Sequence, residues 1–295
     1  KYLDFLFEDK AVKEIRELKQ GKAILLKNVR FYNDEEDVRN LNNKYISFCK
    51  NFDIYINDSF SVSHRTQGSI IIPPKYLPSA IGRVMEKELK SLNTNKKSNK
   101  KIFLIGGAKV EDYFPIFNQL KNKNNKVLAS GVLGNLMLGA KGYDLGYESH
   151  WLKGKGYFTL LPKLKDLLKK YSNQIILPED FGLIDKHNRR IPADLKNAPF
   201  QYKIFDVGPE TIKLFKSNIE KSDYVFMKGP LGYSEFPAFN TSTREILSFI
   251  SQLSKSKRVY SILGGGHLTT TMQKYKIPNN FNTISLSGGA LLQYL

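Results

Sequence analysis

One set of residues in this 295-residue chain that could bind a charged ligand lies in four glycine-containing loops. Each loop follows a short apolar run, which is typical of a strand that ends at a turn. Glycine lets the backbone approach a ligand closely, and the N–H groups that open a following helix bind phosphate. One such loop can serve only as a tight turn, but four together favour phosphate or nucleotide binding. The loops are Gly106-Gly107-Ala108-Lys109, Lys228-Gly229-Pro230-Leu231-Gly232, Gly264-Gly265-Gly266-His267 and Ser287-Gly288-Gly289-Ala290.

The spacing of these glycines argues against two common nucleotide sites. No loop has the pattern Gly-x-x-x-x-Gly-Lys-Ser/Thr, so the sequence does not support a Walker-type phosphate site. The pattern Gly-x-Gly-x-x-Gly does not follow the first strand either, which makes a dinucleotide-dependent dehydrogenase a poor interpretation.

Basic residues in the first part of the chain suggest a second anion site. Arg30 follows one apolar run, and His64 and Arg65 follow another run and the polar segment Asn57-Asp58-Ser59-Phe60. Two arginines just past strand ends could clamp a carboxylate or phosphate, although single arginines more often form surface ion pairs. Two anion sites in separate parts of the chain would suit transfer of a phosphoryl group between two bound ligands.

The composition limits the class of protein. With 46 Lys and Arg against 28 Asp and Glu, the formal charge of +18 allows nucleic acid as a partner. We favour a biased composition instead, because the lysines are scattered and only Asn95–Lys101 is densely basic. The single cysteine, Cys49, excludes an internal disulfide and predicts a reducing compartment, hence a cytoplasmic protein. We expect no membrane partner, because no apolar run approaches the ~18 residues of a membrane span and no secretory signal is visible.

The elements expected to position these residues alternate between strands and helices, which favours a parallel sheet covered on both faces. One helix begins at Pro209, with Ile212, Leu214, Phe215 and Ile219 mainly on one face. Because ligands bind beyond the carboxyl ends of parallel strands, the glycine loops should lie together. The expected strands are Ala23–Leu26, Ile54–Ile56, Ile102–Ile105, Lys126–Ala129, Gln174–Leu177, Tyr224–Met227, Val259–Leu263 and Thr283–Leu286.

A domain boundary is expected near 78–101. Ala80–Leu92 has the apolar spacing of a helix, and the polar loop Asn93–Lys101 follows it. The predicted division is therefore a partial amino-terminal domain at 1–79, a connecting helix and loop at 80–100, a carboxy-terminal domain at 101–285, and a return segment at 286–295.

A series of short motifs, in one order across essentially the whole chain, resembles the motifs of the phosphoglycerate kinase family. Collinear motifs are far more specific than any single one. They are Lys27-Asn28-Val29-Arg30-Phe31, Asn57-Asp58-Ser59-Phe60 with His64-Arg65, Met85-Glu86-Lys87-Glu88-Leu89, Gly106-Gly107-Ala108-Lys109-Val110, Asp206-Val207-Gly208-Pro209, Gly229-Pro230-Leu231-Gly232 with Glu235-Phe236, Gly264-Gly265-Gly266, and Ser287-Gly288-Gly289-Ala290.

The resemblance implies an α/β protein with two Rossmann-like three-layer domains, each with a parallel sheet, joined by a hinge helix. It implies a phosphoglycerate-binding domain at 1–79 and a nucleotide-binding domain at 101–285, with 286–295 returning to the cleft between them. The implied activity is the glycolytic transfer of a phosphoryl group between 1,3-bisphosphoglycerate and ADP, giving 3-phosphoglycerate and ATP. Mg²⁺ is the expected cofactor with ADP or ATP, and we expect a monomer.

The resemblance also assigns roles to single residues. Arg30 and Arg65 would hold the phosphoglycerate with His64 nearby, and Arg30 and Lys109 would act in catalysis. Lys109 would neutralise charge on the nucleotide phosphates or the transferred group, and Glu235 would contact the ribose. The expected nucleotide-binding residues are Gly107, Lys109, Tyr113, Gly131, Pro230, Glu235, Gly265, Gly266, His267, Gly288 and Gly289.

The chain departs from the family pattern at several of these positions. The family's metal-binding Asp is His267, and the following Thr is Leu268, so we expect no metal ligand there. A second family lysine is Tyr113, and an Asn before Gly-Pro is Lys228, which could restore one positive charge. A Gly-Gly-Gly loop reads Ser130-Gly131-Val132.

The resemblance starts inside the family's amino-terminal domain and stops slightly before its usual end, so we expect the sequence to be a fragment. Stretches reading Asp-Phe-Asn and His-Leu-Gly-Arg in the family have no counterpart here. Two alternatives to a working kinase stay open at this point. One is a catalytically inactive relative that acts as a scaffold or subunit of a larger assembly, and the other is an RNA- or polyanion-binding module.

Overall fold

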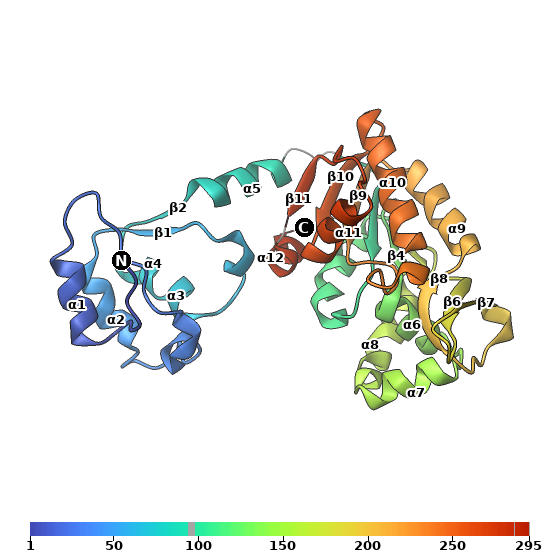
Figure 1. Cartoon of the computed structure of the whole chain (residues 1–295), viewed down its shortest axis with the longest axis horizontal. Helices are drawn as coiled ribbons and strands as arrows, with labels where there is room; N and C mark the ends of the chain where they lie inside the picture. The colour runs from blue at the N-terminus through green and yellow to red at the C-terminus, as the bar shows by residue number, and fades with distance from the viewer. Residues whose placement is uncertain (94–97, 286, 295) are drawn as a thin grey trace. The chain divides into compact units, whose positions relative to one another are not determined.

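The structure, a computed structural model, describes residues 1–93, 98–285 and 287–294. The chain divides into two compact units, Lys1–Lys90 and Ser91–Leu295 (Figure 1). The basic loop expected at 95–101 lies partly outside the described residues, and so do Leu286 and Leu295 of the expected return segment. The roles assigned to 80–100 as a hinge and to 286–295 as a return segment stay predictions.

The first unit is built of short helices around a small apolar core of Leu6, Tyr45, Phe48 and Ile72. Its sheet has two parallel strands, and Tyr55 pairs with Ser79. The elements are α1 (Asp9–Arg16), α2 (Lys44–Phe48), β1 (Tyr55–Asn57), α3 (Gly68–Ile71), α4 (Pro73–Tyr76), β2 (Ser79–Ile81) and most of α5 (Arg83–Asn93), with the 3-10 helices η1 (Val29–Phe31), η2 (Asn33–Glu35), η3 (Cys49–Asn51) and η4 (Phe60–Val62).

The second unit contains a six-stranded parallel sheet in the order β11-β10-β9-β3-β4-β5. Chain order runs outward from β3 on one side and from β9 on the other, so the topology switches between these two strands. Ligands bind at such a switch point in open α/β sheets. The strands are β3 (Lys101–Ile105), β4 (Lys126–Ala129), β5 (Ile175–Ile176), β9 (Tyr224–Lys228), β10 (Tyr260–Gly264) and β11 (Thr283–Ser285).

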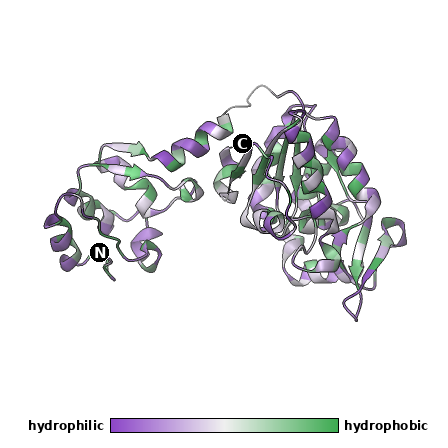
Figure 2. Ribbon diagram, turned by 45° about the horizontal axis from the view of Figure 1, so that its top comes forward, coloured by the Kyte–Doolittle hydropathy of each residue, from purple (hydrophilic) through white to green (hydrophobic). Residues whose placement is uncertain are grey.

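Both faces of this sheet are covered, as expected for parallel strands. On one face, alternate strand residues such as Leu104 and Met227 join Phe215 and Ile250 in one apolar cluster. Phe103 points to the opposite face and is 1% exposed. Figure 2 shows the hydrophobic colouring concentrated on these strands. The helices are η5 (Val110–Lys121, 3-10), α6 (Gly131–Ala140), α7 (Tyr147–Gly154), α8 (Leu161–Lys170), α9 (Pro209–Glu220), α10 (Thr241–Lys255), α11 (Gly266–Lys274) and α12 (Gly288–Tyr294), with short 3-10 turns at η6 (Tyr157–Leu160), η7 (Leu195–Asn197) and η8 (Pro237–Phe239).

A second, three-stranded sheet of antiparallel strands, which the sequence interpretation missed, packs its own cluster around Phe181 and Phe200. Its strands are β6 (Asp180–Ile184), β7 (Arg190–Asp194) and β8 (Lys203–Val207). The motif Asp206–Pro209 lies where β8 ends and α9 begins. There, the Asp180 carboxylate accepts hydrogen bonds from the N–H groups of Glu210 and Thr211 and so caps α9.

Most expected elements are present. The helix beginning at Pro209 is confirmed, and the seven expected strands from Ile54–Ile56 onward match structural strands within one or two residues, as far as the described residues reach. The expected strand Ala23–Leu26 was wrong. This segment makes only an isolated bridge between Leu25 and Tyr2, and Leu25 is 69% exposed. Only residues 1–3 lie beside the segment: the N–H of Leu25 donates to the carbonyl of Lys1 and the N–H of Leu3 donates to the carbonyl of Leu25, so the pairing ends after one bridge.

The helix expected at Ala80–Leu92 begins later, at Arg83. Ala80 and Ile81 belong to β2, because they pair with β1. The Asp58 carboxylate accepts a hydrogen bond from the N–H of Met85 at 2.9 Å, within the first turn of α5. Pairing with a neighbouring strand and a side-chain cap from Asp58 therefore set the start of the helix, and neither can be read from local apolar spacing.

Candidate functional site

The loops after β3 and β9 meet at the switch point of the six-stranded sheet. The N–H of Gly106 donates to the carbonyl of Lys228 at 2.8 Å, and the N–H of Gly107 donates to Pro230 at 2.9 Å. A Cβ at Gly106 would lie 2.1 Å from the carbonyl oxygen of Pro230. Gly229 has a φ of +75°, and its Cβ would lie 2.4 Å from the carbonyl oxygen of Gly106. The two loops therefore touch backbone to backbone, which only glycine allows.

The loop after β4 joins the same cluster. Gly131, at the start of α6, has a φ of +55°, and its Cβ would lie 2.8 Å from the nitrogen of Gly107. The N–H of Val132 donates to the carbonyl of Gly107 at 3.1 Å. Three of the expected residues, Gly107, Gly131 and Pro230, thus lie in adjoining loops at one edge of the sheet. Partly exposed backbone at such an edge can approach a phosphate chain.

Lys109 and Tyr113, which follow the loop after β3, differ in exposure. Lys109 precedes η5 and is exposed, so its ammonium is available to a ligand. Tyr113 is buried at 3% exposure, and its hydroxyl donates to the carbonyl of Gly106 at 2.7 Å. Burial raises the pKa of Tyr113 well above its ordinary value, so the phenol stays neutral. The hydroxyl therefore holds the Gly106 loop in place.

Lys228, the last residue of β9, is a charged residue of this cluster that the expected site did not include. Its side chain is 9% exposed, and its Nζ lies 3.9 Å from Asp112 Oδ2 and 5.0 Å from the centre of the Tyr113 ring. Burial lowers the pKa of Lys228 to about 8, against the opposing effect of Asp112. A signal was present in the sequence, because a lysine closes an otherwise apolar run at the point where ligands bind.

The loop after β10 brings two expected residues together. Gly265 has a φ of +106° and precedes α11, and its N–H donates to Ser285 at 2.9 Å. His267 and Glu235 are both exposed, and Nδ1 of His267 lies 3.2 Å from Oε1 of Glu235. Gly266 is exposed beside His267, and Gly288 and Gly289 open α12 after β11. The carboxylate expected to contact a ribose is therefore a partner of the imidazole.

The side chains present do not fit a magnesium ion held by the protein at this position. Mg²⁺ prefers oxygen ligands, whereas His267 offers an imidazole nitrogen and Glu235 a single exposed carboxylate. In the ranges 1–93, 98–285 and 287–294, no group of three or more His, Cys, Asp or Glu residues could hold a metal ion.

Asp206, paired with Arg190, packs against the loop after β9. Sequence reasoning gave these two residues no such role. The Arg190 guanidinium donates to the buried Asp206 carboxylate at 2.8 Å, which also accepts from the Ser242 hydroxyl. A Cβ at Gly232 would lie 2.5 Å from Asp206 Oδ1. The motif that begins at Asp206 therefore positions the loop that contains Gly229, and its partner Arg190 comes from the missed antiparallel sheet.

The expected phosphoglycerate residues lie in the first unit on short, exposed turns. Arg30 is exposed in η1, Arg65 is exposed after η4, and His64 is half-buried. The segments that follow the two arginines touch each other. The buried carboxylate of Glu35 accepts hydrogen bonds from the N–H and hydroxyl of Ser69 at 2.9 and 2.8 Å. Glu35, which the sequence interpretation missed, therefore holds the two arginine-bearing segments in one region.

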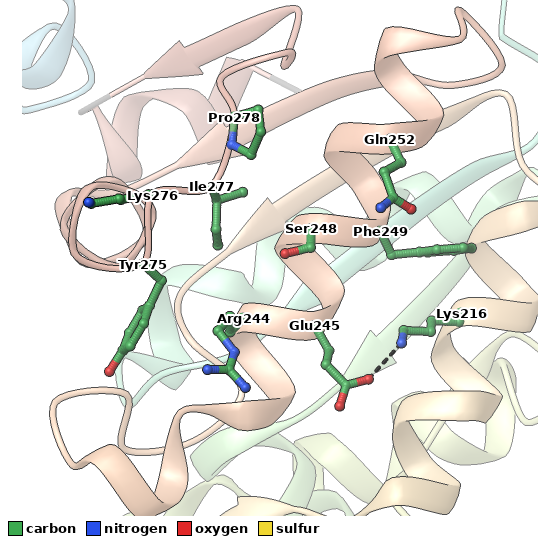
Figure 3. Close-up of a pocket in the computed structure, with 10 residues that line it drawn as sticks. All are labelled: Lys216, Arg244, Glu245, Ser248, Phe249, Gln252, Tyr275, Lys276, Ile277 and Pro278. Carbon is green, nitrogen blue, oxygen red and sulfur yellow. Dashed lines mark hydrogen bonds and ion pairs between the residues drawn. The ribbon is translucent and has the colours of Figure 1, made fainter.

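A cavity of about 300 Å³ lies elsewhere in the second unit, over α10 and the turn that follows α11 (Figure 3). Lys216 and Glu245 form an ion pair of 2.7 Å across part of it. None of the expected site residues lines this cavity. Its lining consists of Lys216, Arg244, Glu245, Ser248, Phe249, Gln252, Tyr275, Lys276, Ile277 and Pro278.

Comparison with known proteins shows which family has this arrangement of loops and strands. The phosphoglycerate kinase family profile matches residues 1–295. The chain belongs to the phosphoglycerate kinase family. The phosphoglycerate kinase of Archaeoglobus fulgidus is 34% identical over 303 residues, which cover 100% of this chain and 73% of that protein. The phosphoglycerate kinase of Methanopyrus kandleri is also 34% identical, over 100% of this chain and 74% of that protein.

Solved structures of phosphoglycerate kinases share the fold. The crystal structure of the enzyme from Pyrococcus horikoshii OT3 aligns with a TM-score of 0.84 at 31% identity, covering 100% of this chain and 75% of that chain. The enzyme from Coxiella burnetii aligns with a TM-score of 0.74 at 24% identity, over 94% and 71% of the two chains. The expected α/β fold with parallel sheets and the expected family are therefore confirmed. In the part of the chain that the structure describes, every helix is too short or too polar to cross a bilayer.

Proposed function

We propose that this chain transfers a phosphoryl group between 1,3-bisphosphoglycerate and ADP, with 3-phosphoglycerate and ATP as the other pair of ligands. The observation that carries the proposal is the interlocked set of glycine loops at the switch point between β3 and β9 in a member of the phosphoglycerate kinase family. Both the family and the geometry support a nucleotide site at this edge. The scaffold and polyanion-binding alternatives gain no support from the comparisons.

In this proposal the second unit binds the nucleotide through backbone and cations. The loops at Gly107, Gly131 and Gly265 approach the phosphates, and the exposed ammonium of Lys109 neutralises charge that develops on the transferred group. Phosphoryl transfer needs mainly positioning and electrostatic stabilisation, so these groups can supply most of the chemistry. Glu235 contacts the ribose once the nucleotide competes with His267 for its carboxylate.

The first unit supplies the other ligand's contacts. Arg30 and Arg65 bind the carboxylate and phosphate groups of phosphoglycerate, with His64 beside Arg65. Guanidinium groups suit these anions because they donate two parallel hydrogen bonds. Arg30 also stabilises negative charge during transfer. The proposal includes a cytoplasmic monomer, in keeping with a glycolytic family. Mg²⁺, which the family generally uses, is proposed to arrive on the nucleotide phosphates.

Isothermal titration calorimetry with ADP is the first test, because the expected nucleotide residues all lie in one unit. We expect saturable binding of ADP to the full chain and turnover of ATP and 3-phosphoglycerate in a coupled assay. Absence of ADP binding by a folded chain would contradict the proposal. Binding without turnover would favour the inactive relative instead.

A further inference from the structure

Lys228 is buried at a place where a buried charge is costly. It closes β9, whose other residues Tyr224 to Met227 are all apolar and buried, and its own side chain is 9% exposed. Moving an ammonium out of water is unfavourable unless hydrogen bonds or an opposite charge compensate.

The surroundings of Lys228 compensate only in part. Among the residues that the structure describes, its one ion-pair partner is Asp112, whose side chain is 45% exposed and whose oxygen is 3.9 Å away. On another side lies the ring of Tyr113, which attracts a cation only weakly at 5.0 Å. Lys109 adds a second positive charge close enough to lower the pKa of Lys228. The two lysines and the one aspartate together carry a net charge of +1, so an anion is the ligand that fits this set of groups.

The position of Lys228 specifies where that anion would lie. The carbonyl of Lys228 accepts from Gly106, so its backbone belongs to the interlocked loops. Its side chain runs along the same edge toward α12, where a Cβ at Gly288 would lie 3.0 Å from Cε and 3.3 Å from Nζ. The ammonium therefore lies between Gly288 and the side chains of Asp112 and Tyr113, at the carboxyl ends of the strands where ligands bind.

We propose that Lys228 binds the phosphate chain of the nucleotide as a second cation beside Lys109, an inference that rests on the proposed function. Tyr113 fills the space beneath the Gly106 loop, and Lys228 supplies positive charge from the neighbouring strand. A bound phosphate supplies the close negative charge that Asp112, at 3.9 Å from the ammonium, provides only weakly.

The matched control is Lys101, which lies in the same sheet at the opposite end. Lys101 pairs with Tyr224 in the register in which Ile105 pairs with Lys228, so both lysines point to one face. Burial lowers the pKa of Lys101 as well. Lys101→Met therefore removes a half-buried lysine of the same sheet without touching the carboxyl edge.

The test compares ADP and adenosine by calorimetry at pH 7 on the full chain, for the wild type, Lys228→Met, Lys228→Gln and Lys101→Met. We expect Lys228→Met and Lys228→Gln to weaken ADP binding about 10- to 100-fold, the range for a hydrogen bond to a charged group. Adenosine, which has no phosphate, should bind all four proteins equally. Lys101→Met should bind both ligands like the wild type.

Other outcomes overturn the inference. Unchanged ADP affinity in Lys228→Met, or an equal loss of ADP and adenosine affinity, assigns Lys228 a purely structural role. If the wild type binds neither nucleoside nor nucleotide, the proposed function fails, and inorganic pyrophosphate then becomes the probe. Pyrophosphate binding that weakens in Lys228→Met retains Lys228 as a phosphate ligand, whereas equal or absent binding removes it.

Discussion

The two units of the chain present their ligand-binding groups in opposite ways. In the second unit, three loops contact each other through glycine backbone, and a lysine is buried among them. In the first unit, Arg30 and Arg65 are exposed on irregular turns, and the small sheet leaves Ile56 and Ile81 56% and 48% exposed. A site made of backbone cannot be separated from the fold that builds it, whereas a site made of exposed side chains can. Substitutions in the two units should therefore act on different quantities.

The largest effect is expected from Gly229→Ala, which should disrupt the second unit itself. The new Cβ would lie 2.4 Å from the Gly106 oxygen at a φ of +75°. Overpacking and the left-handed backbone together should lower the free energy of unfolding by about 2–5 kcal/mol. Thermal unfolding measures this, with Gly154→Ala as the control because nothing lies within 4 Å of its Cβ. Equal unfolding temperatures for the two variants would show that the glycine contacts do not hold the second unit together.

Lys109→Ala should abolish most activity and leave stability unchanged, because the side chain is exposed. Removing one charge donor to the transferred group commonly lowers the rate about 10²–10³-fold. A coupled assay and thermal unfolding, each run beside the exposed control Lys123→Ala, separate the two quantities. Full turnover by Lys109→Ala would show that Lys109 is not a catalytic residue.

Arg65→Ala should weaken 3-phosphoglycerate binding about 10- to 100-fold, through loss of a charged hydrogen bond. Because Arg65 is exposed, ADP affinity and the unfolding temperature should not move. Arg39→Ala, an exposed arginine of the same unit, is the matched control. If both variants bind 3-phosphoglycerate like the wild type, the first unit does not carry this ligand through Arg65.

The pH dependence of ADP binding should distinguish the buried cation from the exposed ones. Lys228 loses its proton as pH rises through about 8, so ADP affinity should fall, up to about tenfold, between pH 7 and 9. The groups facing Lys228 are Asp112 and Tyr113 of η5 and Lys109 just before it, and the α12 side offers uncharged Gly288. Lys228→Met should show a flatter profile in the same calorimetric series; an identical fall in both proteins would assign the titration to another group.

The titration of Lys228 also predicts how the stability of the folded chain changes with pH. The pKa of Lys228 is about 8 in the folded chain and 10.5 as the reference for an exposed lysine, so the unfolded chain binds more protons between these values. The free energy of unfolding should therefore gain a stabilising contribution from Lys228 as pH rises through this window. Denaturant titrations of the wild type and Lys228→Met at pH 7 and pH 9.5 measure the difference.

The smallest effect is expected at His267, at the exposed edge of the second unit. His267→Asp adds a carboxylate beside Glu235 and should tighten ADP binding in Mg²⁺ relative to EDTA by about fivefold, the scale of an exposed charge interaction. His267→Asn, which adds an oxygen without a charge, is the control. Equal ratios in Mg²⁺ and EDTA for Asp and Asn would show that a carboxylate at this position recruits no metal.

Much of the fold could be predicted because its signals are local. Apolar runs, four of which end in glycine loops, located the strands of the six-stranded sheet, and Pro209 marked the start of α9. The failures came where a distant partner decides the outcome. The segment Ala23–Leu26 has the composition of a strand but makes only one bridge, to Tyr2. Ala80 and Ile81 fit a helix by spacing but pair with β1. Three antiparallel strands went unnoticed because their apolar residues are interrupted by polar ones.

The sequence alone determined the family, the fold class and the identity of the glycine loops, because a collinear series of motifs can be recognised without coordinates. Tertiary structure decided which groups face one another. It turned Tyr113 inward to hold the Gly106 loop, joined His267 to Glu235, and buried Lys228 beside Tyr113 and Gly288. These outcomes depend on contacts between residues more than thirty positions apart or on the burial of a whole side chain, and neither is written in local sequence.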